Sequence, residues 1–474
     1  MHGFFEYIEN QDYILLLTNR FISMSNDITI KKGLDIKLKG TAEKVTENAI
    51  ISNTCTIRPE DFHGVLPKLI AKVGTKVKAG EPIFYNKDVE AVKFVSPVSG
   101  EVTEVTRGER RRIMAIKIQA DKEQNYQDNG KFNLDTADGN AVKTHLLATG
   151  CWPFIKQRPY DIIANPEKAP KAIFISGYAS APLAADLDYV LAGKEAELQA
   201  AVTALGKMTE GQVHVSVGKN SNSPLADLNG ITLHKVSGPH PSGNVGTLIN
   251  KIDPVNKGEV VWTVNAQDLV IIGELLLTGK FNAERAVALV GSSVKKPRYF
   301  KTRIGSEVAT MVYDNGVDKD SNDRIISGNV LTGKQVNPDG ALDYYSNTIT
   351  VIPEGDDYEL FGWNKPIFNK ISTSRALTFS WLTPNKKYEL DTNTNGEHRA
   401  FVLTGNYEQV FPLDIYPLQI LKACMYSDLD EMEALGMYEV APEDFALTEF
   451  ICVSKQPHQD IIRKGLDVMI KEIG

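Results

Sequence analysis

Patterns typical of strands and helices alternate along residues 168–300, and this alternation limits the possible folds more than any other feature of the sequence. In chain order, strand, helix, strand, strand, helix and strand are predicted for KAIFISGY, AELQAAVTALGKM, QVHVSVG, ITLHKVSG, AQDLVIIGELLLTG and RAVALVG. Each helix has one apolar face and is long enough to cover a sheet. Strands that alternate with helices form mainly parallel sheets, so we expect an α/β multidomain protein with a Rossmann-like α/β core.

A chain of 474 residues is too long for one core, so two to four domains are expected. Short alternating runs between glycines and prolines predict an N-terminal β domain, a barrel-sandwich of the biotinyl or lipoyl kind. The patterns divide the chain into residues 1–24 (an extension expected to be disordered), 25–120 (barrel-sandwich domain), 121–165 (connector with a helix near 141–148), 166–300 (α/β domain), 301–370 (small β or α+β module) and 371–474 (helical domain).

Helical signals in the last segment fall at three places. One helix is expected to start at Pro412, and a second to start at Asp428 and stop at Gly436. The closing stretch PHQDIIRKGLDVMIKEIG carries five apolar residues on one helical face: Ile461, Ile462, Leu466, Met469 and Ile470.

Composition excludes several classes of protein. The net charge of −8 argues against nucleic acid, and the isolated run from Arg110 to Arg112 is interpreted as a solvated strand end, with contact to anionic lipid or a partner as the alternative. Four cysteines without a C-x-x-C pair argue against a zinc ribbon, an iron–sulfur cluster or a disulfide framework, and favour a reducing compartment. No apolar run approaches the roughly 20 residues of a membrane helix. Residues 1–23 lack the basic start of a signal peptide, and Met24 opens a second plausible beginning.

The stretch VEAVKFVSPVSGEV raises the question of a carrier lysine. In biotinyl and lipoyl carriers the modified lysine lies eleven residues before a glycine of the returning strand. Counting back from Gly100 gives Val89, so Lys93 is expected on the returning strand with its side chain in solvent, and Lys87 is two residues out of register. The barrel is therefore predicted without a prosthetic group, and modification of Lys87 or Lys93 is the alternative.

Nucleotide-binding motifs are incomplete. A dinucleotide fold needs G-x-G-x-x-G after its first strand, but AIFIS is followed only by Gly177. The Walker motif is not matched, because Val213 stands where it requires glycine and Asn220 where it requires Ser or Thr. Gly218 and Lys219 are therefore expected in a plain turn.

The most distinctive stretch is SGPHPSGNVGT, residues 237–247. Two prolines flank His240, and three glycines allow unusual backbone angles and close approach to a partner. The candidate residues for binding a quinone or a partner protein are Gly238, His240, Ser242 and Gly243, with Trp262 or Phe174 as possible apolar walls. A structural turn with His240 capping a neighbouring helix is the other reading, and both stay open. No histidine pair has metal-ligand spacing, no G-x-S-x-G elbow accompanies the loop, and no catalytic residue is assigned.

Several stretches together resemble one family. They include ITIKKGLDIKLKG, KVGTKVKAGEPIF, GCWPFIKQRPYD, SGPHPSGNVGT with NKIDPVNKGEVVWTVNAQDLVIIGELLLTG, ISGNVLTGK, and NYEQVFPLDIYP. In this order they are similar to the A subunits of the sodium-translocating NADH:quinone reductases, over residues 25–474.

The resemblance implies a peripheral subunit on the cytoplasmic face of the bacterial inner membrane. Its partners would be the other subunits of the complex, membrane subunits among them, with NADH, quinone, flavins and iron–sulfur centres in the whole complex and no cofactor bound covalently by this chain. A β-grasp-like (SLBB-type) domain is implied for 301–370. One departure is Thr448, where the family usually has a second cysteine besides Cys452. A soluble NADH- or flavin-binding oxidoreductase is the alternative.

Overall fold

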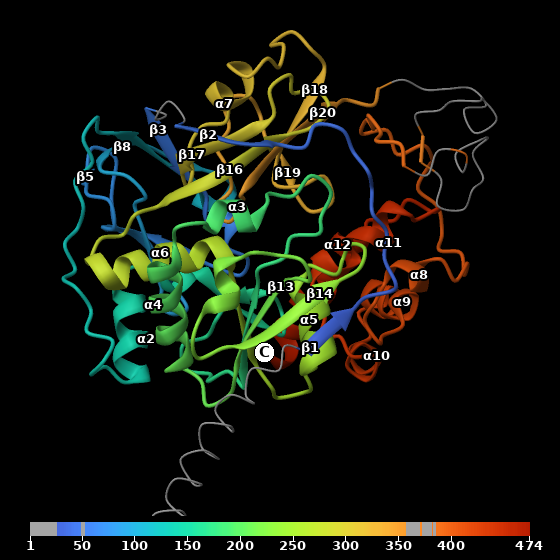
Figure 1. The fold of residues 1–474 in the computed structure, drawn as a ribbon, viewed down its shortest axis with the longest axis horizontal. Coiled ribbons are helices and arrows are strands. Elements are labelled where there is room, and N and C mark those ends of the chain that lie inside the picture. The colour runs from blue at the N-terminus through green and yellow to red at the C-terminus, as the bar shows by residue number, and fades with distance from the viewer. Residues whose placement is uncertain (1–25, 49–52, 357–369, 372–381, 383–384) are drawn as a thin grey trace, which may run out of the picture.

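The computed structural model describes residues 26–48, 53–356, 370–371, 382 and 385–474. The predicted extension of residues 1–24 lies outside them. The described residues form four β-sheets, several covering helices and a group of C-terminal helices (Figure 1). Across this described part, no helix combines the length and the apolar character needed to cross a membrane.

A seven-stranded sheet forms the centre of the molecule. Its order is β1 (Asn26–Thr29), β14 (Thr232–Ser237), β13 (Val213–Gly218), β12 (Ala172–Ser176), β15 (Val261–Asn265), β10 (Ile155–Arg158) and β11 (Ile162–Ile163). The first five strands are parallel, whereas β10 and β11 are antiparallel to their neighbours. The predicted mainly parallel α/β sheet is therefore confirmed. Strands β12 to β15 follow the spatial order third, second, first, fourth, so the order reverses between β12 and β15.

Both faces of this sheet are covered, which explains why its strands are apolar throughout. In β12, Ile173 and Ile175 face one hydrophobic cluster and Phe174 faces another. The first face lies against α2 (Gly139–Ala148), α4 (Glu195–Gly206) and α6 (Ala266–Thr278); α3 (Leu187–Leu191) contacts α6. The second lies against α5 (Val245–Ile252) and the C-terminal helices. The predicted helices over α2, α4 and α6 are confirmed; α5, which begins inside the predicted loop, was not anticipated.

The barrel-sandwich consists of two small sheets. One contains β3 (Thr54–Ile57), β9 (Ile113–Ala120), β8 (Gly100–Arg107) and β5 (Lys76–Val77), and the other β4 (Pro67–Leu69), β6 (Pro82–Asn86) and β7 (Lys93–Val95). Aromatic rings fill the space between them: Phe84 and Phe94 stack at 4.4 Å, and Phe62 lies 4.4 Å from Phe94. Short turns η1 (Pro59–Asp61) and η2 (Glu109–Arg111) join the strands.

A six-stranded sheet forms the third module. Its order is β19 (Lys334–Gln335), β18 (Asp323–Ser327), β20 (Thr348–Pro353), β16 (Glu284–Val290), β17 (Arg298–Arg303) and β2 (Glu43–Asn48), with α7 (Ala309–Tyr313) beside it. We expected RAVALVG in the α/β sheet, but it forms β16 here. This strand is buried on both faces, with Val287 and Leu289 on one and Ala288 and Val290 on the other, and so it has the pattern of a parallel-sheet strand.

The N-terminal strands do not pair within the barrel. β1 pairs with β14 of the seven-stranded sheet, and β2 pairs with β17 of the six-stranded sheet. Residues 26–48 therefore cross between two modules before the barrel begins. The six-part division of the chain remains a prediction.

The C-terminal helices are α8 (Tyr407–Val410), α9 (Pro417–Tyr426), α10 (Leu429–Ala434), α11 (Ala446–Phe450) and α12 (His458–Ile473), with the short turn η6 (Pro442–Phe445). The predictions for α10 and α12 are confirmed, and Asp428 caps α10. The start predicted at Pro412 is wrong, because α9 begins at Pro417. Tyr416 before it is extended, as a residue preceding proline tends to be, and Pro417 occupies the first helical position.

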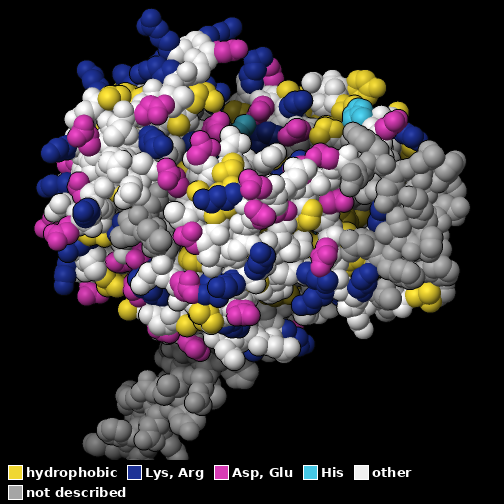
Figure 2. Space-filling model, turned by 90° about the horizontal axis from the view of Figure 1, so that it is seen from above, with side chains coloured by type: hydrophobic (Ala, Val, Ile, Leu, Met, Phe, Trp, Pro, Cys, Tyr) yellow, Lys and Arg dark blue, Asp and Glu magenta, His cyan; other side chains and the backbone are white. Residues whose placement is uncertain are grey.

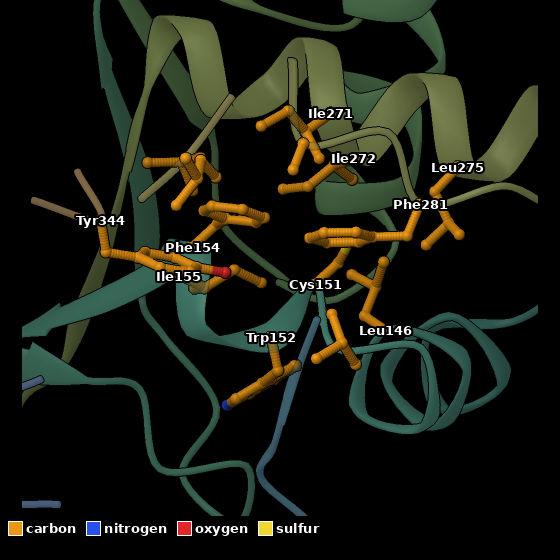
Figure 3. Close-up of a cluster of buried hydrophobic side chains, with 14 of the residues drawn as sticks. Leu146, Cys151, Trp152, Phe154, Ile155, Ile271, Ile272, Leu275, Phe281 and Tyr344 are labelled. Atoms are coloured by element: carbon orange, nitrogen blue, oxygen red, sulfur yellow. The ribbon is translucent and has the colours of Figure 1, made fainter. Parts of the chain in front are cut away.

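The segment we expected to be a connector contributes to the central core. Figure 3 shows side chains that surround Phe154, from the end of α2, from residues 151–155 and from α6. The ring of Phe154 stacks on Phe281 at 6.2 Å and on Tyr344, from the six-stranded module, at 5.3 Å. The pair Asp268 and Arg285, joined at 2.7 Å and buried, links α6 to β16. The segment expected as a connector, the α/β module and the six-stranded module therefore meet around this cluster.

The loop at the carboxyl ends of the parallel strands

The candidate residues lie where an α/β sheet usually binds its ligand. The loop of residues 237–244, which we call the proline loop, follows β14, and residues 176–180 follow β12 at the same edge of the sheet. Ligands of such sheets bind outside the carboxyl ends of the strands, at the point where the strand order reverses. The proline loop reaches that point, because the Ser176 hydroxyl donates to the carbonyl of Gly243 at 2.7 Å.

His240 is held by both its main chain and its side chain. Its main-chain N–H donates to the Asp35 carboxylate at 2.9 Å, and its ring Nδ1 lies 3.0 Å from the Ser180 hydroxyl. Only 3% of the residue is exposed, and this burial lowers the pKa of His240 to about 4. The imidazole is therefore neutral at pH 7. With Nδ1 assigned as the acceptor from Ser180, the proton is on Nε2.

Gly243 is fixed by close packing. Its main-chain N–H donates to the Ser180 hydroxyl at 2.8 Å, and a Cβ atom at this position would overlap the carbonyl of Tyr178. Ser242 is buried and donates to the carbonyl of Gly238 at 2.9 Å. The four candidate residues thus belong to one hydrogen-bonded unit, and the sequence analysis had assigned them to one loop.

A segment that sequence reasoning missed closes this unit from outside. Residues 30–35 follow β1, and Leu34 donates its main-chain N–H to the carbonyl of His240 at 2.8 Å. Gly33 and Gly238 both have positive φ angles, and a Cβ on either would overlap the opposite backbone. The glycine in IKKGLDI was the available signal, since glycine marks close backbone approach.

The chemistry of this unit differs from that of a nucleophilic triad. In a triad the carboxylate binds the imidazole and the imidazole activates the serine. Here the Asp35 carboxylate accepts from the main chain of His240, and the Ser180 oxygen already accepts from Gly243. The arrangement orients backbone groups and one neutral imidazole, and it does not assemble an acid–base pair.

The two expected apolar walls lie elsewhere in the sheet. Trp262 pairs with Ile173, near the amino ends of the strands, and stacks edge-on against Trp152 at 5.3 Å. Phe174 is fully buried beneath α5. The proline loop and these rings are not brought together. Lys219, in the expected plain turn, forms an ion pair with Asp27 at 3.2 Å, and the turn is confirmed.

The remaining sequence candidates occupy separate places. Lys93 lies half-buried at the start of β7, and Lys87 is exposed in the turn before it. Thr448 contacts His458 at 2.9 Å, while the Cys452 sulfur contacts Tyr407 at 3.0 Å. The four cysteines are buried and free. Within the described ranges, no three side chains of His, Cys, Asp or Glu are arranged to hold a metal ion.

Comparisons with known proteins connect this architecture to one family. Three family models match: the NqrA N-terminal barrel-sandwich hybrid domain over residues 28–121, the NqrA second alpha/beta domain over 137–281, and the NqrA C-terminal (SLBB) domain over 286–337. A solved chain of an NAD+-reducing NiFe-hydrogenase is 12% identical, with a TM-score of 0.33, over 49% of this chain and 52% of that one.

Curated relatives match along nearly the whole length. The A subunit of the Na(+)-translocating NADH-quinone reductase of Neisseria meningitidis Z2491 is 36% identical over 450 residues, covering 94% of this chain and 100% of the relative. The A subunit from Rhodopirellula baltica is 34% identical, covering 94% of this chain and 98% of the relative. The chain therefore belongs to the NqrA family, the A subunits of the Na+-translocating NADH-quinone reductases.

Proposed function

We propose that this chain is a scaffold and docking subunit of a sodium-pumping NADH:quinone oxidoreductase, held at the cytoplasmic face of the bacterial inner membrane. The complex couples NADH oxidation and quinone reduction to sodium export, and the flavins and iron–sulfur centres are carried by partner chains. The supporting observation is that the chain's own residues 30–35 pack against the proline loop at the edge where an α/β sheet usually holds a dinucleotide. The Rossmann-like, lipoyl-like and β-grasp-like relationships of the three modules are part of this proposal.

A soluble NADH- or flavin-binding oxidoreductase is the weaker candidate. Such a protein needs a glycine-rich cradle after β12 so that backbone N–H groups approach the phosphates. Only Gly177 follows this strand, and a Cβ there would already overlap Leu225 and the carbonyl of Ser216. Flavin absorbance in the purified chain would favour this candidate.

A docking face is available on α9. Its outward positions carry Tyr416, Gln419, Lys422, Met425 and Tyr426, and Tyr426 is 84% exposed. Tyrosine and methionine are enriched at protein interfaces, whereas most exposed helix faces are charged. We propose that another component of the complex covers this face.

The test is purification of the tagged chromosomal copy from membranes in mild detergent, with an assay of sodium-stimulated NADH:quinone reductase activity. We expect the other subunits and the activity to co-purify. A Tyr416→Ser, Tyr426→Ser variant should lower the yield of partners by more than about tenfold, because two aromatic anchors are removed. Leu277→Ser, at an exposed position of α6, is the control. A lone, inactive chain would overturn the proposal.

For the quinone, we propose contact with the proline loop. The observation that favours it is the hydrogen bond from Ser180 to His240 Nδ1. Because Nδ1 accepts this bond, the Nε2–H group of His240 is the donor that could bind a quinone carbonyl. Gly238 is exposed beside it. A His240→Ala variant should bind a quinone analogue at least about tenfold more weakly. Unchanged binding by a folded variant would remove His240 from the quinone site.

A further inference from the structure

One segment of the barrel has an unusual surface. Residues 66–78, LPKLIAKVGTKVK, contain four lysines and no acidic residue, in a chain with a net charge of −8. Three large aliphatic side chains are exposed among these lysines: Leu66 (51%), Ile70 (45%) and Val73 (61%). We call this stretch the lysine segment.

These side chains flank the turn that leads from β4 in one sheet of the barrel-sandwich to β5 in the other, and Ile70, Lys72, Val73 and Lys76 lie nearest to that turn. Leu69, Ala71 and Val77 point into the core of the barrel. The residues between them, Lys68, Ile70 and Lys72 on one side of the turn and Lys76 and Lys78 on the other, are exposed. Val73 occupies the tip of the turn.

Hydrogen bonds hold the turn of the lysine segment in place. At its turn, Thr75 donates its main-chain N–H to Lys72, and its hydroxyl accepts from the main chain of the same residue at 3.1 Å. Gly74, with a positive φ, donates to the carbonyl of Val102 in β8 at 2.8 Å. The outward side chains therefore project from an anchored backbone, and little order has to be gained on binding.

Three acidic residues lie near the lysine segment. Glu101 lies opposite Lys76 across the ladder of β5 and β8, the Glu81 carboxylate accepts from the main chain of Lys78, and Glu90 lies near Lys68, whose ammonium group is over the ring of Tyr85 at 5.4 Å. None of the four lysines forms an ion pair with a described carboxylate. Side chains of both signs mix over the face shown in Figure 2.

The composition distinguishes a lipid surface from a protein partner. Protein interfaces are enriched in Tyr, Trp, Met and Arg and depleted in Lys. The lysine segment contains four lysines and no Tyr, Trp, Met or Arg. The α9 face, with two tyrosines, a methionine and one lysine, has the opposite composition. Exposed aliphatic groups flanked by lysines are typical of chains that lie on anionic bilayers, with apolar groups at the acyl boundary and ammonium groups at the phosphates.

We propose that the lysine segment lies on the surface of an anionic phospholipid bilayer. This inference rests on the proposed function, which places the chain beside the inner membrane. In Figure 1, β5 of this segment and the helices α8 to α10 lie at opposite ends of the long axis. The lipid contact and the contact with a partner chain are therefore on separate surfaces and can form together.

The test is flotation of the purified full-length chain with vesicles. We expect binding to phosphatidylglycerol/phosphatidylethanolamine vesicles, weakened by salt, and no binding to phosphatidylcholine vesicles. Lys72→Gln, Lys76→Gln should weaken binding about 25-fold, at about fivefold per lysine. Ile70→Ser, Val73→Ser should weaken it at least about fivefold, because insertion of the aliphatic groups is lost.

The matched control is Lys319→Gln, Lys464→Gln, which makes the same charge change at exposed lysines of other modules. Thermal unfolding verifies that each variant is folded. The proposal is overturned if the chain does not bind the anionic vesicles, or if the control weakens binding as much as the lysine-segment variant. It is also overturned if the Ile70, Val73 variant loses partner subunits while it keeps vesicle binding. Co-purification without vesicle binding would sink only this inference, and vesicle binding without co-purification only the proposed function.

Discussion

At the scale of residues, the glycines of SGPHPSGNVGT were recognisable from sequence, but their partners were not. A rigid loop with close backbone approach follows from glycine and proline chemistry. The approaching groups come from distant parts of the chain: residues 30–35 meet Gly238, and the Asp444 carboxylate meets Gly246. No local pattern carries such pairings. For the same reason, the role of Ser180 in holding His240 could be found only in the fold.

Buried histidines give the chain a defined dependence of stability on pH. Burial lowers the pKa of His214, His240 and His458 to about 4, against about 6.5 in an unfolded chain. Below about pH 6.5 the unfolded state binds more protons, so these groups destabilise the fold as pH falls toward 4. The loss is on the order of 2 kcal/mol for each histidine.

Urea unfolding of the wild type and of His240→Asn between pH 7 and pH 4.5 measures this effect for one group. The Asn side chain can accept from Ser180 but cannot take up the proton. We therefore expect the free energy of unfolding of the variant to fall less steeply with decreasing pH. Parallel curves for the two proteins would contradict the prediction.

At the scale of elements, periodicity identified the helices α2, α4, α6, α10 and α12 and the strands β12, β13 and β14. It failed where the same pattern is compatible with two arrangements. The strand of β12 and that of β16 are both buried on two faces, so their sequences do not reveal that they belong to different sheets. The start of α9 was misplaced by five residues because Pro412 and Pro417 are both compatible with a helix start, and the helix begins at Pro417. The pairing of β1 and β2 with other modules depends on long-range contacts that no local pattern records.

At the scale of the whole molecule, one hydrophobic cluster joins the barrel to the α/β module. It includes Phe94 and Ile118 of the barrel as well as Ile175 and Leu269 around the central sheet. The core of the six-stranded module is a separate cluster, which includes Ile349. Residues that share one contiguous cluster tend to open together. We therefore expect the barrel and the α/β module to unfold as one unit.

Phe154 is the residue with which to test this coupling, since it is 1% exposed and contacts Phe281 and Tyr344. Phe154→Ala should cost about 3–5 kcal/mol. In native-state hydrogen exchange, we expect protection to fall by a similar amount in β8 and β9 of the barrel and in α6 of the α/β module. Ile349→Ala, in the separate cluster, should lower the hydrogen-exchange protection of β18 and β20 first. If Phe154→Ala loosens α6 but leaves β8 and β9 protected, the two modules are independent, and the barrel would carry the lysine segment as a unit that moves on its own.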